Sequence, residues 1–358
     1  MQNTLRFISI VYILLLSVGL FAHVEIVPGL LSIAKRDSWI SILLSLVVLP
    51  VWVFVINKIL LITKKRSIIH LLKETNKGIV YSILLFPLAI YMLLNAFVTA
   101  KEIVYWSQIS YMQGFNNFLL AAILLLFCVI CSRSGLFSIG VLSSILCPLV
   151  LFLGFFISFA NMKRKNYELL FPLFTEGYVP IVKGLLYTSL PILELFIIIF
   201  LTPVLKKVIT KRQLLTVGFL IVGLTLGPTI AAIAEFGPEQ AVKYRFPAYE
   251  QWRLISIGRY FSHADFFAVF QWLSGGVIRI SLFVLISCEI LTKGKQSRTL
   301  IRLMYGIILA ACTYPIDQST FIAVSYGVFR PLSFFFMVIQ MSIIAVYLLK
   351  NKKKSIGG

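Results

Sequence analysis

The fold is decided by FPLFTEGYVPIVKGLLYTSLPILELFIIIFLTP, residues 171–203, a loop followed by an apolar run long enough to cross a bilayer. Pro191 lies in the middle of that run, and because proline has no amide proton it should leave the carbonyl of Tyr187 without a helical partner. Glu194 follows three residues later. A carboxylate and a free carbonyl in hydrocarbon cost about a few kcal/mol, so we expect both to face a polar cavity near the bilayer midplane.

The composition places most of the chain in a membrane. Hydrophobic residues make up 59% of the 358 residues, and the mean hydropathy is +0.96, far above the values of soluble domains. The net charge of +20 comes from Lys and Arg residues between apolar runs, which indicates membrane topology and no nucleic-acid partner. The five cysteines fall in or beside apolar runs, where they predict neither a disulfide framework nor a metal site. No cofactor is predicted.

Apolar runs of about twenty residues predict ten crossings. Their ranges are 7–34, 39–61, 79–100, 117–132, 136–160, 180–203, 213–235, 264–291, 300–313 and 327–349. The chain is therefore predicted to be all-α, a polytopic membrane protein with a single permease-like domain over residues 1–358. Its first five-helix half covers residues 1–160 and its second covers residues 180–349, followed by a basic tail at residues 350–358.

The first crossing resembles the sixth. It contains GLFAHVEIVPG, residues 19–29, in which Pro28 should free the carbonyl of Val24. Ten crossings with broken helices at positions one and six predict two inverted halves, the LeuT-like 5+5 arrangement. Of the 33 Lys and Arg residues, 20 fall on the side of the two termini and 12 on the other side. Both termini are therefore predicted to be cytoplasmic.

Polar residues in other crossings are candidates for the same cavity. Tyr91 and Asn95 share one face of the third crossing, and Gln271, Gly275 and Arg279 share one face of the eighth. The predicted ligand-binding residues are Val24, Pro28, Tyr91, Asn95, Tyr187, Thr188, Ser189, Pro191, Glu194, Gln271, Ser274, Gly275 and Arg279.

Two interpretations of these residues remain open. Glu194 and Arg279 are either a structural ion pair between the sixth and eighth crossings or direct contacts of a ligand or proton, because intramembrane charges usually pair. For Tyr91, Asn95 and Gln271, interhelical hydrogen bonding is favoured over contact with a ligand.

Two loops carry amphipathic patterns. Large apolar side chains recur every three residues from Phe246 to Ile255, which predicts a helix across the outer mouth of the protein. KKRSIIHLLKETNK, residues 64–77, predicts a short helix against the inner leaflet.

Several stretches together resemble the spore germination permease family. They are residues 171–194; FGPEQAVKYRFPAYEQWRLISIGRYF, residues 236–261; FQWLSGGVIRISLF, residues 270–283; and KRDSWISILL, residues 35–44. The likeness covers nearly the whole chain, including ten crossings and a basic tail. The family usually has Pro-Phe-Gly-Glu in the sixth helix, whereas here Pro191 is followed by Ile192, Leu193 and Glu194. Leu in place of Gly narrows the space for a ligand or a neighbouring helix.

The resemblance implies a function. This family belongs to the amino acid–polyamine–organocation superfamily and supplies the B subunit of germinant receptors in endospore-forming bacteria. It implies a membrane A subunit and a lipoprotein C subunit as partners, the inner membrane of the spore as location, and an amino acid or nucleoside as the nutrient that triggers germination.

Other functions remain as alternatives to a receptor. A secondary amino acid transporter and a nutrient-gated water or ion pore both fit the same fold. An enzyme is not expected, because the three histidines are scattered and no catalytic acid–base pair, nucleotide motif or metal motif is present in the sequence.

Overall fold

A computed structural model describes residues 4–64, 66–75, 78–255 and 264–354. These residues form a bundle of long helices, and over them no β-strand occurs beyond one isolated bridge between Leu5 and Leu205. The all-α part of the prediction is confirmed. The rest of the predicted basic tail, residues 355–358, and the end of the predicted outer amphipathic segment, residues 256–263, lie outside the described residues.

Seven helical stretches of the described chain are long and apolar enough to cross a membrane. They are Phe7–Thr63, Gly78–Ser110, Asn117–Ala160, Val179–Val204, Lys211–Phe236, Phe266–Leu291 and Gln318–Asn351. The first stretch changes direction at Lys35, where φ is 44°, and the third is kinked at Gly135, where φ is 85° and ψ is 173°. Each of the ten predicted runs is thus helical over most of its length, while the count of ten crossings and the inverted repeat stay predictions.

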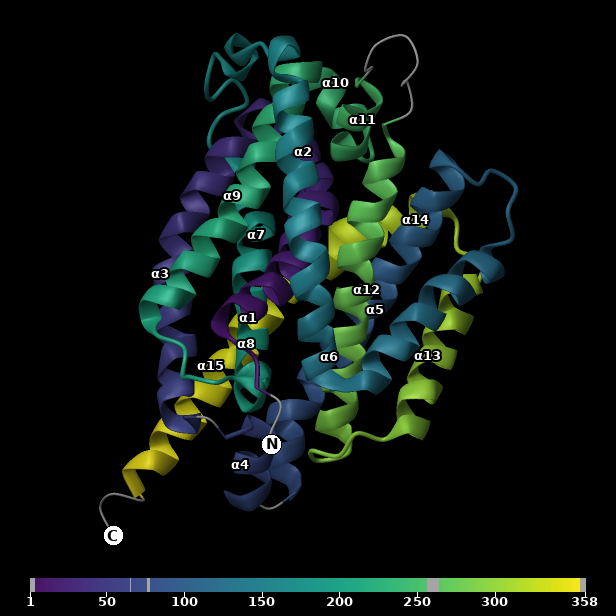
Figure 1. Cartoon of the computed structure of the whole chain (residues 1–358). Coiled ribbons are helices and arrows are strands. Elements are labelled where there is room, and N and C mark those ends of the chain that lie inside the picture. The colour runs from purple at the N-terminus through teal and green to yellow at the C-terminus, as the bar shows by residue number, and fades with distance from the viewer. Residues whose placement is uncertain (1–3, 65, 76–77, 256–263, 355–358) are drawn as a thin grey trace.

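Most stretches are single long helices, and short helices lie at the two ends of the bundle (Figure 1). The long helices are α3 (Ser38–Thr63), α5 (Gly78–Ser110), α6 (Asn117–Ala160), α9 (Lys211–Phe236), α12 (Phe266–Leu291), α13 (Arg298–Thr313) and α15 (Arg330–Lys354). The helix α4 (Ile68–Thr75) lies at the end that also holds both chain termini. The helices α10 (Pro238–Lys243) and α11 (Pro247–Arg253) lie at the opposite end. Both predicted amphipathic segments therefore contain helices, and the side chains of Phe246, Tyr249, Trp252 and Ile255, which recur every three residues, are buried.

The first stretch is distorted but not broken. It runs through α1 (Phe7–Leu14), the π-helices η1 (Leu15–Gly19) and η2 (Phe21–Ile26), and α2 (Val27–Ala34), with right-handed helical angles at the junctions. Pro28 lies in the first turn of α2, where its missing N–H leaves no helical bond unmade. The prediction of a break at Pro28 is therefore wrong, because the chain widens into π-helix before the proline instead of unwinding at it.

The sixth predicted crossing is also continuous. It consists of α7 (Val179–Leu193), the 3₁₀-helix η6 (Glu194–Ile197), α8 (Ile198–Leu201) and the 3₁₀-helix η7 (Thr202–Val204). Pro191 lies inside α7, and the backbone tightens into 3₁₀ geometry directly after it, with Glu194 at φ −66° and ψ −10°. The predicted interruption is wrong here as well, because a change of winding accommodates the missing amide proton.

The changed winding still presents backbone carbonyls to side chains. Three such bonds run from Arg279 to the carbonyl of Ser17, from Tyr326 to that of Glu25, and from Trp52 to that of Leu193. The sequence instead predicted free carbonyls at Val24 and Tyr187. The Glu25 carbonyl lies one residue from Val24, the Leu193 carbonyl six residues from Tyr187, and the Ser17 carbonyl seven residues from Val24. Ser17 and Glu25 lie in π-helix and Leu193 directly precedes 3₁₀-helix, so the changed winding determines which carbonyls bond to side chains.

Two glycines allow the close helix contacts that position the site. A Cβ atom at Gly275 of α12 would lie 2.5 Å from the Leu20 side chain and 2.8 Å from the Leu16 carbonyl oxygen. A Cβ atom at Gly29 of α2 would lie 2.3 Å from the ring of Tyr326. The π-helix η8 (Ser325–Phe329) follows α14 (Gln318–Val324) and contains Tyr326. Small residues let membrane helices approach closely, so Gly275 and Gly29 allow α12 and η8 to pack against the first stretch.

Candidate functional site

The most deeply buried ion pair joins Arg279 of α12 to Glu194 of η6. Two parallel bonds of 2.6 and 2.7 Å connect the guanidinium to both carboxylate oxygens, and both side chains are fully buried. Arg279 also donates to the hydroxyl of Thr99 at 3.2 Å, the carbonyl of Ser17 at 3.3 Å and the side chain of Asn95 at 3.3 Å. A guanidinium has five N–H donors, so every donor of Arg279 is used within the protein.

A second buried ion pair joins Arg330 of α15 to Glu25 of η2, with a distance of 2.6 Å. The hydroxyl of Thr99 connects the two pairs, since it accepts from Arg279 and donates to Glu25 at 2.9 Å. The ring of Phe21 lies between the two guanidinium groups, with centroid distances of 4.2 and 4.7 Å. Cation–π contacts of this kind favour charged groups that have lost their water.

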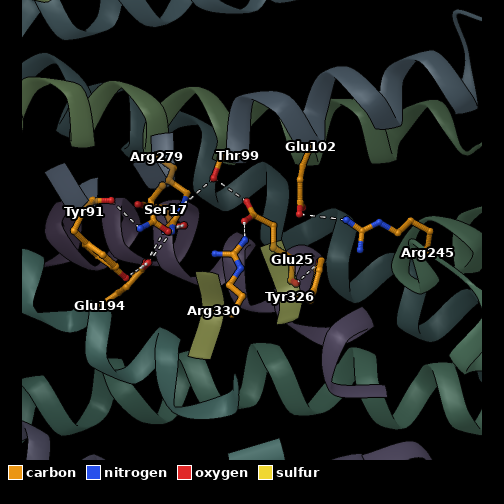
Figure 2. A network of polar contacts seen from close by, with 11 residues as sticks. Ser17, Glu25, Tyr91, Thr99, Glu102, Glu194, Arg245, Arg279, Tyr326 and Arg330 are labelled. Carbon is orange, nitrogen blue, oxygen red and sulfur yellow. Dashed lines mark hydrogen bonds and ion pairs between the residues drawn. The ribbon is translucent and has the colours of Figure 1, made fainter. Parts of the chain in front are cut away.

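A third pair extends this arrangement toward α11. Arg245 lies 3.2 Å from Glu102 and packs over the ring of Tyr326 at 4.7 Å. Tyr326 in turn donates to the backbone carbonyl of Glu25 at 2.6 Å. The result is a line of three acid–base pairs through the protein (Figure 2), with equal numbers of each charge.

We call this arrangement the polar network. Its members are Ser17, Glu25, Tyr91, Asn95, Thr99, Glu102, Glu194, Arg245, Arg279, Tyr326 and Arg330. It connects residues of the first helical stretch with α5, η6, α12, η8 and α15. Buried charges are tolerated when they are paired and hydrogen-bonded, and each charged group of the network has an oppositely charged partner. Four buried atoms of the network have no hydrogen-bond partner among the described residues: Oγ of Ser17, Oε2 of Glu102 and Nε of Arg245 and Arg330.

Four of the predicted site residues meet in this network. Tyr91 lies 3.4 Å from Glu194, and Asn95 contacts Arg279, as their shared helix face indicated. Asn95 also donates to the carbonyl of Tyr91 at 2.9 Å. Of the two interpretations of Glu194 and Arg279, this geometry matches the structural ion pair, and a direct contact with a ligand stays a prediction.

Five other predicted residues lie in α7 and α2 and mostly make helix–helix contacts. Tyr187 donates to the carbonyl of Tyr326 at 2.5 Å, and Thr188 donates to the carbonyl of Ser41 in α3 at 3.1 Å. Ser189 is fully buried, and its hydroxyl has no hydrogen-bond partner among the described residues. Pro28 and Pro191 are also buried.

A cavity of about 670 Å³ lies beside the polar network, between the first stretch, α6, α9, α11 and α12. Its walls are mostly apolar, and two predicted site residues, Val24 and Gln271, line it. The Gln271 amide is occupied at both ends, because it accepts from Trp252 and donates to the carbonyl of Val150, each at 3.0 Å. Tyr249 also lines the cavity, and burial raises the pKa of its phenol, which donates to Asp265 at 3.2 Å.

The remaining two predicted residues lie along α12. Gly275 packs against Leu20 as described above. Ser274 lines a second cavity of about 420 Å³ between α5, α6 and α12. The predicted residues are thus distributed over the polar network, the helix contacts and two cavities.

Four buried polar groups that line the larger cavity have an atom without a hydrogen-bond partner among the described residues. These atoms are Oε2 of Glu235, Nε2 of Gln251, Nε1 of Trp106 and Nε1 of Trp272. The exposed fractions are 1% for the Glu235 side chain, 5% for Gln251, 0% for Trp106 and 3% for Trp272. A buried polar atom without a partner costs about 1–3 kcal/mol, so four around one cavity require an explanation.

Sequence reasoning missed these four residues. The sequence shows Glu235 as an acidic residue at the end of an apolar run. No spacing or motif relates it to Gln251, Trp106 or Trp272. No group of three or more His, Cys, Asp or Glu residues in the described ranges is arranged to hold a metal ion.

Comparison with known proteins identifies the family of this chain. The family model described as spore germination protein, the spore permeases, matches residues 3–321. The chain is 36% identical over 357 residues to spore germination protein XB of Bacillus anthracis, and the match covers 98% of this chain and 99% of that protein. The resemblance to the spore germination permease family stated from the sequence is confirmed.

Proposed function

This chain belongs to the spore germination protein family, and on that basis we propose that it is the B subunit of a germinant receptor. In this role it binds a small nutrient, an amino acid or a nucleoside, within its membrane part and triggers germination. Its partners would be the membrane A subunit and the lipoprotein C subunit of the receptor. It would reside in the inner membrane of the spore with both termini in the cytoplasm.

The observation that carries this proposal is the way the polar network joins distant helices. Arg279 of α12, Glu194 of η6 and Arg330 of α15 are held together through Thr99 of α5 and Glu25 of η2. Removing one partner of a buried pair costs about 3–5 kcal/mol, so this network stabilises one arrangement of five helical segments. A nutrient that binds more tightly to a second arrangement of these five segments would shift the equilibrium toward it. All five segments would then move together, as a sensor requires.

The first test uses spores that lack this chain, exposed to a panel of amino acids and nucleosides. Germination is followed by the loss of optical density. A response to at least one nutrient that disappears with the chain and returns on complementation is the expected result. Responses that are unchanged across the whole panel would reject the receptor role.

A second test addresses the predicted mid-membrane residues. Spores carrying Tyr187→Phe, Ser189→Ala or Glu194→Gln are compared with Ser45→Ala, whose buried hydroxyl donates only to the Ile42 carbonyl of its own helix. A shifted nutrient dose response in the first three, with the protein present at normal amounts by immunoblot, supports a nutrient site at these residues. A dose response equal to that of Ser45→Ala in all three places the site elsewhere.

A secondary transporter is the alternative function. Uptake of labelled amino acids by reconstituted vesicles separates the two, because a sensor need not move its ligand across the membrane. Ion conductance that depends on nutrient and occurs without solute uptake would indicate a nutrient-gated pore.

A further inference from the structure

The cavity offers polar atoms that the protein itself does not use. Trp106 of α5, Glu235 of α9, Gln251 of α11 and Trp272 of α12 come from four separate helices and line the same space. Each is at least nine-tenths buried, and each has one atom without a hydrogen-bond partner among the described residues. Polar groups brought together by distant helices and left incomplete are typical of a ligand site.

We propose that this cavity is the nutrient site of the receptor, with Glu235, Gln251, Trp106 and Trp272 binding the polar head of the nutrient. This inference rests on the proposed receptor function, and it places the nutrient beside the polar network instead of within it. The volume of about 670 Å³ is in the range of about 300–1,000 Å³ that small-molecule sites occupy.

The unpaired atoms define the chemistry of the nutrient. The two indoles supply N–H donors, so the nutrient must carry at least two acceptor oxygen or nitrogen atoms. The Gln251 amide lies close to the Glu235 carboxylate, so these two groups would bind neighbouring atoms of the nutrient. Glu235 supplies one acceptor oxygen, so the nutrient must also carry a donor. The carboxylate has Lys165 at 3.8 Å from its other oxygen, and this nearly neutral pairing favours a nutrient without net charge.

The walls define the rest of the nutrient. Apart from these groups the lining is dominated by apolar side chains, such as those of Leu16, Leu20, Val150 and Leu224, which favour an apolar or flat aromatic body. The rings of Trp106 and Trp272 lie 4.3 Å apart beside the ring of Phe246. A zwitterionic amino acid with an apolar side chain and a neutral nucleoside both have this chemistry.

The cavity is directly connected to the polar network on two sides. Val24 of η2 lines the cavity, and the next residue is Glu25, which pairs with Arg330. Phe246 lines the cavity as well, and the guanidinium of Arg245 lies 5.2 Å from its ring. A nutrient that moves Val24 or Phe246 therefore acts on a network residue one position away.

The test uses spores with the complete receptor, and it compares three substitutions. Trp272→Phe removes an unpaired indole N–H, and Glu235→Gln removes the charge while preserving the shape of the side chain. Trp252→Phe is the matched control, because Trp252 also lines the cavity but its N–H is already bonded to Gln271. The nutrient concentration for half-maximal germination is measured with L-leucine, L-phenylalanine and inosine, and protein amounts are measured by immunoblot.

We expect Trp272→Phe to raise the half-maximal concentration of the active nutrient about tenfold or more, the equivalent of one lost hydrogen bond. Trp252→Phe should change it much less at equal protein amount. Glu235→Gln separates the two kinds of nutrient: it should abolish a response to an amino acid, whose ammonium needs the carboxylate, and largely preserve a response to inosine.

The result that overturns this inference is a dose response unchanged in both Trp272→Phe and Glu235→Gln. Together with lost response in Glu194→Gln, that result would place the nutrient in the polar network and leave the receptor function intact. A failure of the receptor function itself appears separately, as normal germination of spores that lack the chain. Binding of the active nutrient to the purified full-length protein, measured by its effect on thermal unfolding in detergent, gives an independent readout for the same variants.

Discussion

The polar network and the cavity lie against different faces of the first helical stretch, and they differ in the space beside their polar groups. Phe21 and Glu25 contact the network, whereas Leu20 and Val24 line the cavity. In the network, every donor of Arg279 has an acceptor from the chain. In the cavity, four buried side chains have a polar atom without one. The network also has buried atoms without a partner among the described residues, namely Oγ of Ser17, Oε2 of Glu102 and Nε of Arg245 and Arg330. None of these residues lines the cavity, whereas the four unpaired groups of the cavity face space for a ligand.

The largest expected effect comes from breaking the network at its centre. Arg279→Met leaves Glu194 buried and unpaired, which should lower the free energy of unfolding by about 3–5 kcal/mol. The protein amount in membranes and the unfolding temperature in detergent measure this. The matched control is Arg253→Met, because the Arg253 side chain is 59% exposed in its pair with Glu250 and such pairs contribute about 0–1 kcal/mol.

The double variant Arg279→Met with Glu194→Leu sharpens this result. Replacing both charges by apolar groups removes the unpaired carboxylate, so most of the lost stability should return. If the double variant is as unstable as Arg279→Met, the cost arises from packing instead of from the unpaired charge. If it is stable and still responds to nutrient, the pair has a structural role.

Thr99→Val tests the connection between the two ion pairs. The substitution preserves the shape of the side chain but removes the hydroxyl that bonds to Arg279 and Glu25. Loss of hydrogen bonds to charged groups should cost about 1.5–3 kcal/mol of unfolding free energy. Thr99→Ser retains the hydroxyl and serves as the control. Equal stability of Val and Ser at this position would mean that the two ion pairs do not depend on the bridge.

Gly275→Ala tests the contact that separates the two regions. The added methyl group would lie 2.8 Å from the Leu16 carbonyl oxygen and 2.5 Å from the Leu20 side chain, and such overpacking costs about 1–3 kcal/mol. Gly306→Ala in α13 is the matched control, because nothing lies within 4 Å of its added Cβ atom. Thermal unfolding of both variants in detergent compares them. A loss of stability that is the same at both positions would contradict a close contact at Gly275.

Parts of this arrangement could be predicted from the sequence. The spacing of four residues placed Tyr91 and Asn95 on one helix face and Arg279 on the same face as Gly275. The cost of a charge in a membrane made an ion pair between Arg279 and Glu194 one of two open interpretations. Both pairs of neighbours are present in the structure. These inferences depend only on helix geometry and on the energy of a single buried charge.

Other parts depend on tertiary packing and could not be predicted. Glu25 and Arg330 are 305 residues apart, and no periodicity relates them. The prolines correctly marked distorted helices, but whether a helix unwinds or changes its winding is decided by the neighbours that accept its carbonyls. The unpaired atoms of the cavity were invisible in the sequence, because a missing partner is a property of the folded protein and not of any residue type.

The smallest expected effect is the difference in stability between substitutions of two tryptophans that line the same cavity. Trp252 and Trp272 are 2% and 3% exposed, but only the indole of Trp252 is hydrogen-bonded, to Gln271. Each substitution replaces a buried indole with a smaller phenyl ring, and the two indoles are similarly buried. The loss of apolar contact is therefore similar in both variants. Trp252→Phe additionally leaves the Gln271 oxygen without that donor, whereas Trp272→Phe removes an N–H that had no partner. Trp252→Phe should therefore be less stable than Trp272→Phe by about 1 kcal/mol, measured by thermal unfolding in detergent without nutrient. With saturating nutrient this gap should narrow or reverse, because wild type and Trp252→Phe gain stability from binding while Trp272→Phe gains less. The same order in both conditions, with no change in the gap, would mean that Trp272 makes no bond to the nutrient.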